Sequence, residues 1–137
     1  MSDIVVGYDG SDASKAALRH ASEFAQALGD RLVLVFGYAP HGYGGGEVPT
    51  QREAVKELGE KATAEGAEIA KSENVDYEVE LVPEHPVRAV MDVASERDAR
   101  MIVVGSHGDN PLKGAIIGST PHKLVQLSET PVLVVRA

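Results

Sequence analysis

The 137-residue chain contains no cysteine and no tryptophan, and only 4% of its residues are aromatic. Without cysteine there is neither a disulfide framework nor a thiolate metal site. Because disulfides belong to oxidising compartments, we expect the protein in the cytoplasm. No basic-then-apolar leader follows Met1, and no apolar run approaches the roughly 18 residues of a membrane-spanning helix. We therefore expect neither a signal peptide nor a membrane span.

Positive charge is also scarce. The chain has 13 Lys and Arg against 21 Asp and Glu, a formal net charge of −8. Such a charge opposes binding to nucleic acids and to anionic membranes, so we expect neither as a partner. It also repels a nucleotide at long range, so any phosphate site must work through local geometry.

Several motifs of catalysis and metal binding are missing. The five histidines do not fall at a ligand spacing such as HxxxH, so we expect no metal site made by them. There is no GxSxG elbow, and Ser106 and His107, as chain neighbours, are expected to point apart, which argues against a hydrolase triad. His107 is expected to form a hydrogen bond within its own loop. Neither the Walker pattern nor GxGxxG is present.

Short apolar runs alternate with helical patterns along the chain. The runs predict strands at 3–7, 32–36, 77–81, 101–104 and 132–135, and the patterns between them predict helices at 12–28, 51–72, 86–97 and 121–128. Residues 77–81 alternate polar and apolar, which indicates a half-exposed edge strand. The other strands lack polar breaks, which is typical of burial on both faces. The order indicates one α/β domain with a parallel, doubly wound sheet and right-handed crossovers.

The helical periodicity also predicts which side chains face the sheet. In the first helix these are Ala17, Leu18, Ala21, Phe24, Ala25 and Leu28. In the second they are Val55, Leu58, Ala62 and Ile69. Residues 38–49, rich in glycine, predict a surface loop between strand and helix.

The stretch 105–120, GSHGDNPLKGAIIGST, joins a buried strand to a helix start. Glycine lets the backbone approach a ligand closely, and a helix start offers unpaired N–H groups and a positive dipole end that suit phosphate. Ser119 and Thr120 stand where their hydroxyls could cap the helix or bond a phosphate oxygen. The alternative is an ordinary loop whose glycines only make turns.

The expected topology places a second stretch beside this one. In doubly wound sheets ligands sit at the carboxyl ends of the strands, where the strand order reverses. That rule brings Asp9, after the first strand, into one crevice with 105–119. Asp9 has two possible roles there: capping the next helix, or contacting a ribose or a metal ion beside phosphates.

The spacing Gly105-x₂-Gly108-x₉-Gly118-Ser119 resembles the nucleotide loop of the universal stress protein family. Residues 4–11, IVVGYDGS, resemble that family's first strand and turn, and residues 130–136, TPVLVVR, resemble its last strand. The resemblance covers residues 1–137 in order. It implies a Rossmann-like sheet of the adenine nucleotide alpha hydrolase-like type, five parallel strands in the order 3-2-1-4-5, and a single domain of this family.

The resemblance also implies a site for an adenine nucleotide. The residues it implicates are Gly7, Asp9, Gly37, Val104, Gly105, Gly108, Gly118, Ser119 and Thr120. Of these, Gly7, Gly37, Val104 and Gly105 would lie on the adenine side, with Gly7 and Gly37 also near the ribose, whereas the last four would hold ribose and phosphates. Asp9 would lie near the nucleotide and could hold a magnesium ion with it. Asp109 departs from the family pattern, which often has Arg or Lys there.

The function implied is that of an ATP-binding regulator of the stress response, a homodimer through strand 132–135 that acts on an unidentified downstream protein. Two alternatives stay open: a family member that binds AMP or cyclic AMP, and an ATP-using enzyme on the same fold, such as a slow ATPase, a phosphotransferase or an ATP-pyrophosphatase-like ligase. Phosphoryl transfer needs charges that stabilise the transition state, and the loop offers Lys113 but no arginine. Only Asp109 could align a water there, so we expect bound ATP to be kept rather than turned over.

Overall fold

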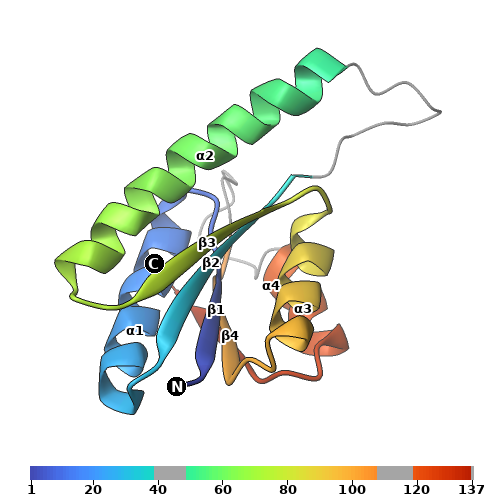
Figure 1. Ribbon diagram of the computed structural model, residues 1–137. Coiled ribbons are helices and arrows are strands. Elements are labelled where there is room, and N and C mark those ends of the chain that lie inside the picture. Colours follow the sequence, from blue (N-terminus) through green and yellow to red (C-terminus); the bar gives the residue numbers. More distant parts are fainter. Residues whose placement is uncertain (39–48, 108–118, 137) are drawn as a thin grey trace.

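A computed structural model of the chain describes residues 1–38, 49–107 and 119–136. Strands and helices alternate in the order β1 (Asp3–Gly7), α1 (Asp12–Leu28), β2 (Arg31–Gly37), α2 (Pro49–Ser72), β3 (Tyr77–Val82), α3 (Pro86–Glu96), β4 (Met101–Gly105), α4 (Ser119–Leu127) and β5 (Val132–Val135). The loop predicted for 38–49 falls mostly outside the described residues, and Pro49 already belongs to α2. Neither the long α2 helix, shown in green in Figure 1, nor any other helix of the described residues combines the length and the apolar character that crossing a membrane requires.

The five strands form one parallel sheet in the order β3-β2-β1-β4-β5, which confirms the predicted topology. β1 lies in the centre and pairs with both neighbours, Ile4 opposite Leu32 of β2 and opposite Met101 of β4. The chain adds β2 and β3 on one side of β1 and then crosses to the other side for β4 and β5. The strand order therefore reverses between β1 and β4.

Helices cover both faces of the sheet, α1 and α2 on one face and α3 and α4 on the other (Figure 1). Alternate residues of β1 divide between the two cores: Ile4 and Val6 pack toward α1 and α2, whereas Val5 packs toward α3. All three are fully buried. A fully buried aliphatic side chain contributes about 1.5–3 kcal/mol, so the central strands supply much of the stability.

Two predictions about helix faces are wrong. In α1 the alanines face inward as predicted, but Phe24 is 39% exposed and Leu28 is 44% exposed in the last two turns. In α2, Val55 is 38% exposed and Leu58 is 64% exposed, because the first half of this helix runs past the sheet (Figure 1). Periodicity gives the direction of a helix face but not how far the helix extends beyond the layer that covers it.

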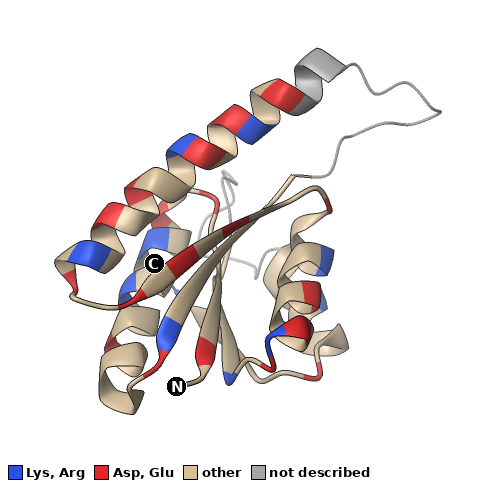
Figure 2. Cartoon of the chain, viewed as in Figure 1, with Lys and Arg blue, Asp and Glu red and all other residues tan. Residues whose placement is uncertain are grey.

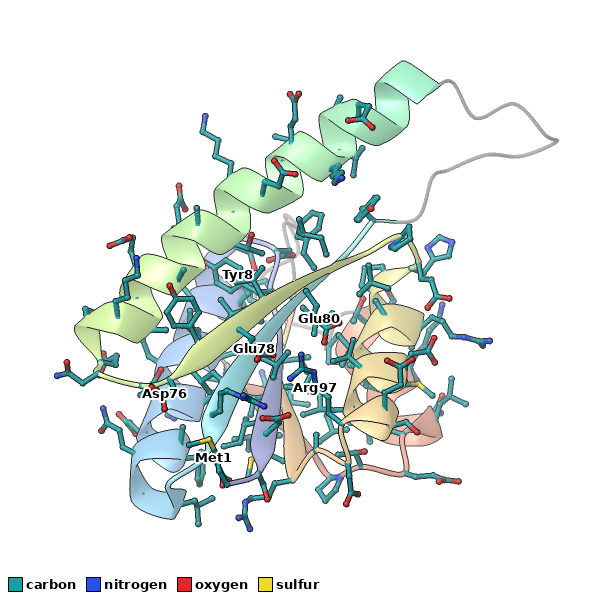
Figure 3. The ribbon with its side chains drawn as sticks, in the orientation of Figure 1. Met1, Tyr8, Asp76, Glu78, Glu80 and Arg97 are labelled. Atoms are coloured by element: carbon teal, nitrogen blue, oxygen red, sulfur yellow. The ribbon has the colours of Figure 1, made fainter. Side chains whose placement is uncertain are left out.

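A cluster of ion pairs ties the edge strand β3 to the start of β1 and the end of α3. Arg97 donates to Asp3 Oδ2 at 3.3 Å, to Glu78 and, at 2.8 Å, to Glu80. Arg31 donates to Asp3 Oδ1 at 3.0 Å and pairs with Glu78 at 3.3 Å. Burial opposes the charge on Arg97, but the hydrogen bonds to the three carboxylates outweigh it and raise the pKa of its guanidinium. Glu78, Glu80 and Arg97 are labelled together in Figure 3.

We predict that Arg97→Ala lowers the free energy of unfolding by about 1–3 kcal/mol, because it leaves the buried Asp3 carboxylate and two glutamates short of a partner. Urea denaturation at neutral pH measures this. The matched control is Arg88→Ala, which removes one exposed pair with Asp92 at 3.6 Å on the surface of α3 and should change stability much less. Equal losses in both variants would show that solvent screens the Arg97 cluster as well.

Candidate functional site

A cleft of about 110 Å³ lies at the carboxyl ends of β1, β2 and β4, where the strand order reverses. Ligands of doubly wound sheets bind at this position. Of the residues that the sequence implicates, Gly7, Asp9, Gly37, Val104, Gly105 and Thr120 line the cleft. Gly108 and Gly118, like Asp109 and Lys113, lie outside the described residues.

One wall of the cleft is apolar and contains Val35, Val90 and Val104, which belong to the core cluster under α3. Gly7 and Gly37, which also line this side of the cleft, lie too close to other parts of the protein to carry a side chain without a shift. A Cβ added to Gly7 would lie 2.9 Å from Val104 Cγ1, and one added to Gly37 would lie 2.8 Å from backbone atoms of Glu84 and Pro86. The protein therefore needs glycine at both positions whether or not a ligand binds.

A ring of hydrogen bonds forms the polar wall at the start of α1. Ser11 is the N-cap of α1, and its Oγ accepts from the Ser14 N–H at 3.2 Å. Asp9 Oδ1 accepts from the Ser11 N–H at 2.9 Å, and the Asp9 N–H donates to Ser14 Oγ at 3.4 Å. Asp9 therefore positions the cap and is not itself the cap, and the sequence reasoning missed Ser14 as a residue of the cleft.

Three helices begin at the cleft. Ser11 caps α1, Pro86 is the first residue of α3, and Thr120 is the second residue of α4, and all three residues line the cleft. The α4 helix begins at Ser119 and not at Pro121 as predicted, so Ser119 and Thr120 lie inside its first turn and do not precede it. Helix starts present unpaired N–H groups and positive partial charge, which suits an anion.

The prediction that Ser106 and His107 point apart is wrong. Ser106 Oγ lies 3.1 Å from His107 Nδ1, and both residues are buried. β4 ends at Gly105 and the chain bends at Ser106, so the alternation of side chains stops before this pair. His107 lines the cleft and was missed as a site residue, although its place just beyond β4 was a signal for it. Among the residues that the structure describes, Ser106 is the hydrogen-bond partner of the His107 ring.

A second hollow, a groove of about 510 Å³, runs between α3 and α4 and adjoins the cleft at Pro86 and Thr120. Met91, Lys123 and the predicted site residue Ser119 line it, and Ser119 does not line the cleft itself. Ser119 and Thr120 are neighbours on α4, but only Thr120 lines the cleft as well as the groove.

Tyr8, next to Asp9, belongs mainly to the core on the α1 and α2 side. Burial, then the charges of Glu65 and Asp9, raise the pKa of its hydroxyl to about 12, so the phenol stays protonated at neutral pH. Gly66 of α2 makes room for the ring, because an added Cβ would lie 3.1 Å from it. Figure 3 labels Tyr8 between the sheet and the two helices.

Among the described residues no group of three or more Asp, Glu or His could hold a metal ion. Asp9 is exposed and is the carboxylate that lines the cleft in the described part. One carboxylate binds Mg²⁺ in proteins chiefly together with substrate phosphates. A magnesium ion at Asp9 would therefore need the phosphates of a bound nucleotide as its other ligands.

Fold and cleft together define a class, the doubly wound α/β proteins with a ligand site at the topological switch point. Comparison with known proteins narrows this class. The model of the universal stress protein family matches residues 1–136, and the chain belongs to that family. A relative from Thermus aquaticus, the universal stress protein in the QAH/OAS sulfhydrylase 3′ region, is 36% identical over 134 residues, 97% of each chain.

Solved structures of the same family resemble this chain over nearly its whole length. The universal stress protein from Archaeoglobus fulgidus has a TM-score of 0.82 and 26% identity, covering 98% of both chains. A universal stress protein in complex with cAMP has a TM-score of 0.71 and 28% identity, covering 98% of this chain and 96% of that one. A structure of the universal stress protein from Archaeoglobus fulgidus in complex with dAMP has a TM-score of 0.75 and 25% identity, covering 98% of this chain and 98% of that one.

We predict that Gly105→Ala costs about 1–3 kcal/mol of unfolding free energy, because the added Cβ would lie 2.7 Å from the Cβ and carbonyl carbon of Ala13 and would push α1 away from β4. Gly29→Ala serves for comparison, since a Cβ there meets nothing within 4 Å and only the positive φ of 70° opposes it. Chemical denaturation of both variants gives the difference. A Gly105→Ala loss no larger than that of Gly29→Ala would contradict the close approach.

Proposed function

We propose that this protein binds an adenine nucleotide in the cleft and acts as a nucleotide-dependent regulator in the stress response. The observation that carries the proposal is the meeting of an apolar wall with three helix starts at the topological switch point. Family members in complex with cAMP and dAMP, at 28% and 25% identity, support an adenine nucleotide as the ligand class.

The two ends of the nucleotide match different walls. Val35, Val90 and Val104 offer an apolar surface to the base, whereas Asp9 stands beside the polar end for a ribose hydroxyl or a phosphate-bound magnesium ion. The cleft of about 110 Å³ is smaller than the roughly 300–1,000 Å³ of common ligand pockets. We therefore place the base and ribose inside it and the phosphates at its border, near Thr120.

We propose ATP as the nucleotide, because the sequence spaces Gly105, Gly108, Gly118 and Ser119 as ATP-binding members of the family do. AMP or cyclic AMP is the second candidate, and it is favoured by the monophosphates bound to the two solved relatives. The choice depends on Gly108 and Gly118, which stay predictions from the sequence.

A regulatory role fits the cleft better than catalysis. Phosphoryl transfer is accelerated by cations that neutralise the developing charge. No lysine or arginine lines the cleft in the described part of the chain, and Arg88 and Lys123 line only the adjoining groove. We propose that the nucleotide is retained and that an unidentified protein partner reads the occupied state. The lack of cysteine supports the cytoplasm as the place of action.

Calorimetry on nucleotide-free protein tests the proposal, with native mass spectrometry of the protein as purified. We expect binding of ATP, weaker binding of AMP and cyclic AMP, and ATP turnover far below the roughly 1–100 s⁻¹ typical of kinases. Tighter binding of AMP or cyclic AMP would favour the second candidate, and no binding of any of the three would overturn the function. Turnover in the kinase range that is lost in Asp109→Asn would favour an enzyme.

We further propose a homodimer through β5. The sheet has two edges, and they differ in chemistry: β3 carries Glu78 and Glu80, whereas β5 reads Val-Leu-Val-Val and is partly exposed at Val132 to Val134. Figure 2 shows the acidic residues along β3 in red. Charged side chains protect an edge from pairing with another chain, and an apolar edge invites it. The charges of β3 therefore direct association to β5.

We expect Leu133→Lys to shift the protein from dimer to monomer at micromolar concentration, measured by multi-angle light scattering. The matched control is Val79→Lys, which puts the same side chain on the β3 edge at a site that is 39% exposed and should leave the dimer intact. Circular dichroism of both variants checks the fold, because Leu133 also packs against the core. A wild-type monomer, or dissociation by Val79→Lys alone, would contradict the β5 interface.

A further inference from the structure

The cleft in this acidic protein has one described side chain that can carry positive charge. His107 lines it, whereas lysine and arginine are absent from its described lining. His107 is only 8% exposed, so the imidazole is enclosed by protein and not free in solvent. The rest of the described lining consists of aliphatic, aromatic, hydroxyl, proline and glycine residues together with the exposed carboxylate of Asp9.

Ser106 holds one side of this imidazole. The Ser106 N–H donates to the Val135 carbonyl at 2.8 Å, which anchors the residue between the ends of β4 and β5. Its Oγ lies 3.1 Å from His107 Nδ1. In the tautomer in which the Ser106 hydroxyl donates to Nδ1, the ring proton resides on Nε2, and Nε2 has no hydrogen-bond partner among the described residues. In that tautomer the pair leaves one N–H donor for a ligand.

We propose that His107, positioned by Ser106, donates a hydrogen bond from Nε2 to the phosphate of the bound nucleotide nearest the ribose. This inference rests on the proposed function and names a specificity residue for it. His107 reaches the cleft from the end of β4, and Thr120 reaches it from the first turn of α4, so an imidazole, a hydroxyl and a helix start converge on one region. A phosphate there would accept from all three, whereas an adenosine without phosphate would leave them to water.

The consequence is a preference for nucleotides over nucleosides that depends on His107. Calorimetric affinities for adenosine, AMP and ATP test it in the wild type and three variants. His107→Asn keeps a polar atom near the Nδ1 position for Ser106 and removes the distal donor. We expect it to weaken AMP and ATP about tenfold and to leave adenosine within about twofold. His107→Gln restores a distal N–H and should recover most of the loss, and Ser106→Ala should lose about threefold on AMP.

The control is His122→Asn, the same substitution at an exposed histidine of α4 that does not line the cleft, and it should bind all three ligands as the wild type does. Thermal melting checks the fold of every variant. If His107→Asn is unfolded, His107→Gln and Ser106→Ala decide, because unchanged AMP affinity in Ser106→Ala would overturn the proposal.

The outcomes separate this inference from the function on which it rests. A wild type that binds none of the three ligands overturns the proposed function. If the wild type binds AMP and His107→Asn binds it with the same affinity, only the proposed role of His107 is overturned. Equal losses for adenosine and AMP in His107→Asn would also overturn it, since the imidazole would then shape the wall of the cleft without contacting a phosphate.

Discussion

The pairing of β1 with both β2 and β4 is the constraint on which the rest of the structure depends. Ile4, Val5 and Val6 are fully buried, so β1 needs helices on both of its faces and a strand on each side. Parallel neighbours can be reached only through crossover helices, and right-handed crossovers in the two directions from β1 place those helices on opposite faces. The reversal of strand order beside β1, and with it the cleft, follows from burying this one segment.

The charged residues differ between the two ends of the parallel sheet. All five strands begin at the same end, and the arginines there form ion pairs with carboxylates: Arg31 and Arg97 with Asp3, and Arg100 with Asp30. The hydrogen bond from Arg100, together with the Ser2 N–H, lowers the pKa of the Asp30 carboxyl. The helices α1, α3 and α4 begin at the opposite end of the sheet, where the strands end. The positive ends of their dipoles therefore lie together at a place where these arginines are absent. An acidic protein can in this way offer an anion a favourable place without a basic patch.

Most of the fold could be predicted because each strand and helix has a local signal. The apolar runs and the helical patterns between them predicted the order of elements, and the mixed pattern at 77–81 predicted the edge position of β3. The errors share a cause. The exposure of Leu58 depends on where α2 leaves the sheet, and the contact between Ser106 and His107 depends on a bend just past the end of β4. Both are set by tertiary geometry, which periodicity does not encode.

The candidate site was predicted in part for the same reason. The family resemblance implied Gly7, Asp9, Gly37 and Gly105, which lie at strand ends around the cleft, whereas it did not lead to Ser14 or His107. Ser14 reaches the cleft from a turn of α1, and no spacing in the sequence sets it apart, whereas the place of His107 just beyond β4 was a signal that was not used.

The glycines also limit what their pattern can say about the ligand. A Cβ on Gly7, Gly37 or Gly105 would lie 2.7–2.9 Å from atoms of the protein itself, so the closest packing of the fold already requires all three. Their presence therefore follows from packing, and it does not distinguish ATP from AMP or an occupied cleft from an empty one. Information about the ligand has to come from residues that line the cleft and that the packing of the fold does not require. Val135 anchors Ser106 and Ser106 holds His107, yet nothing in the described protein uses the outer nitrogen of that ring. The phosphate proposed above would accept from that nitrogen, to which the packing of the protein assigns no other role.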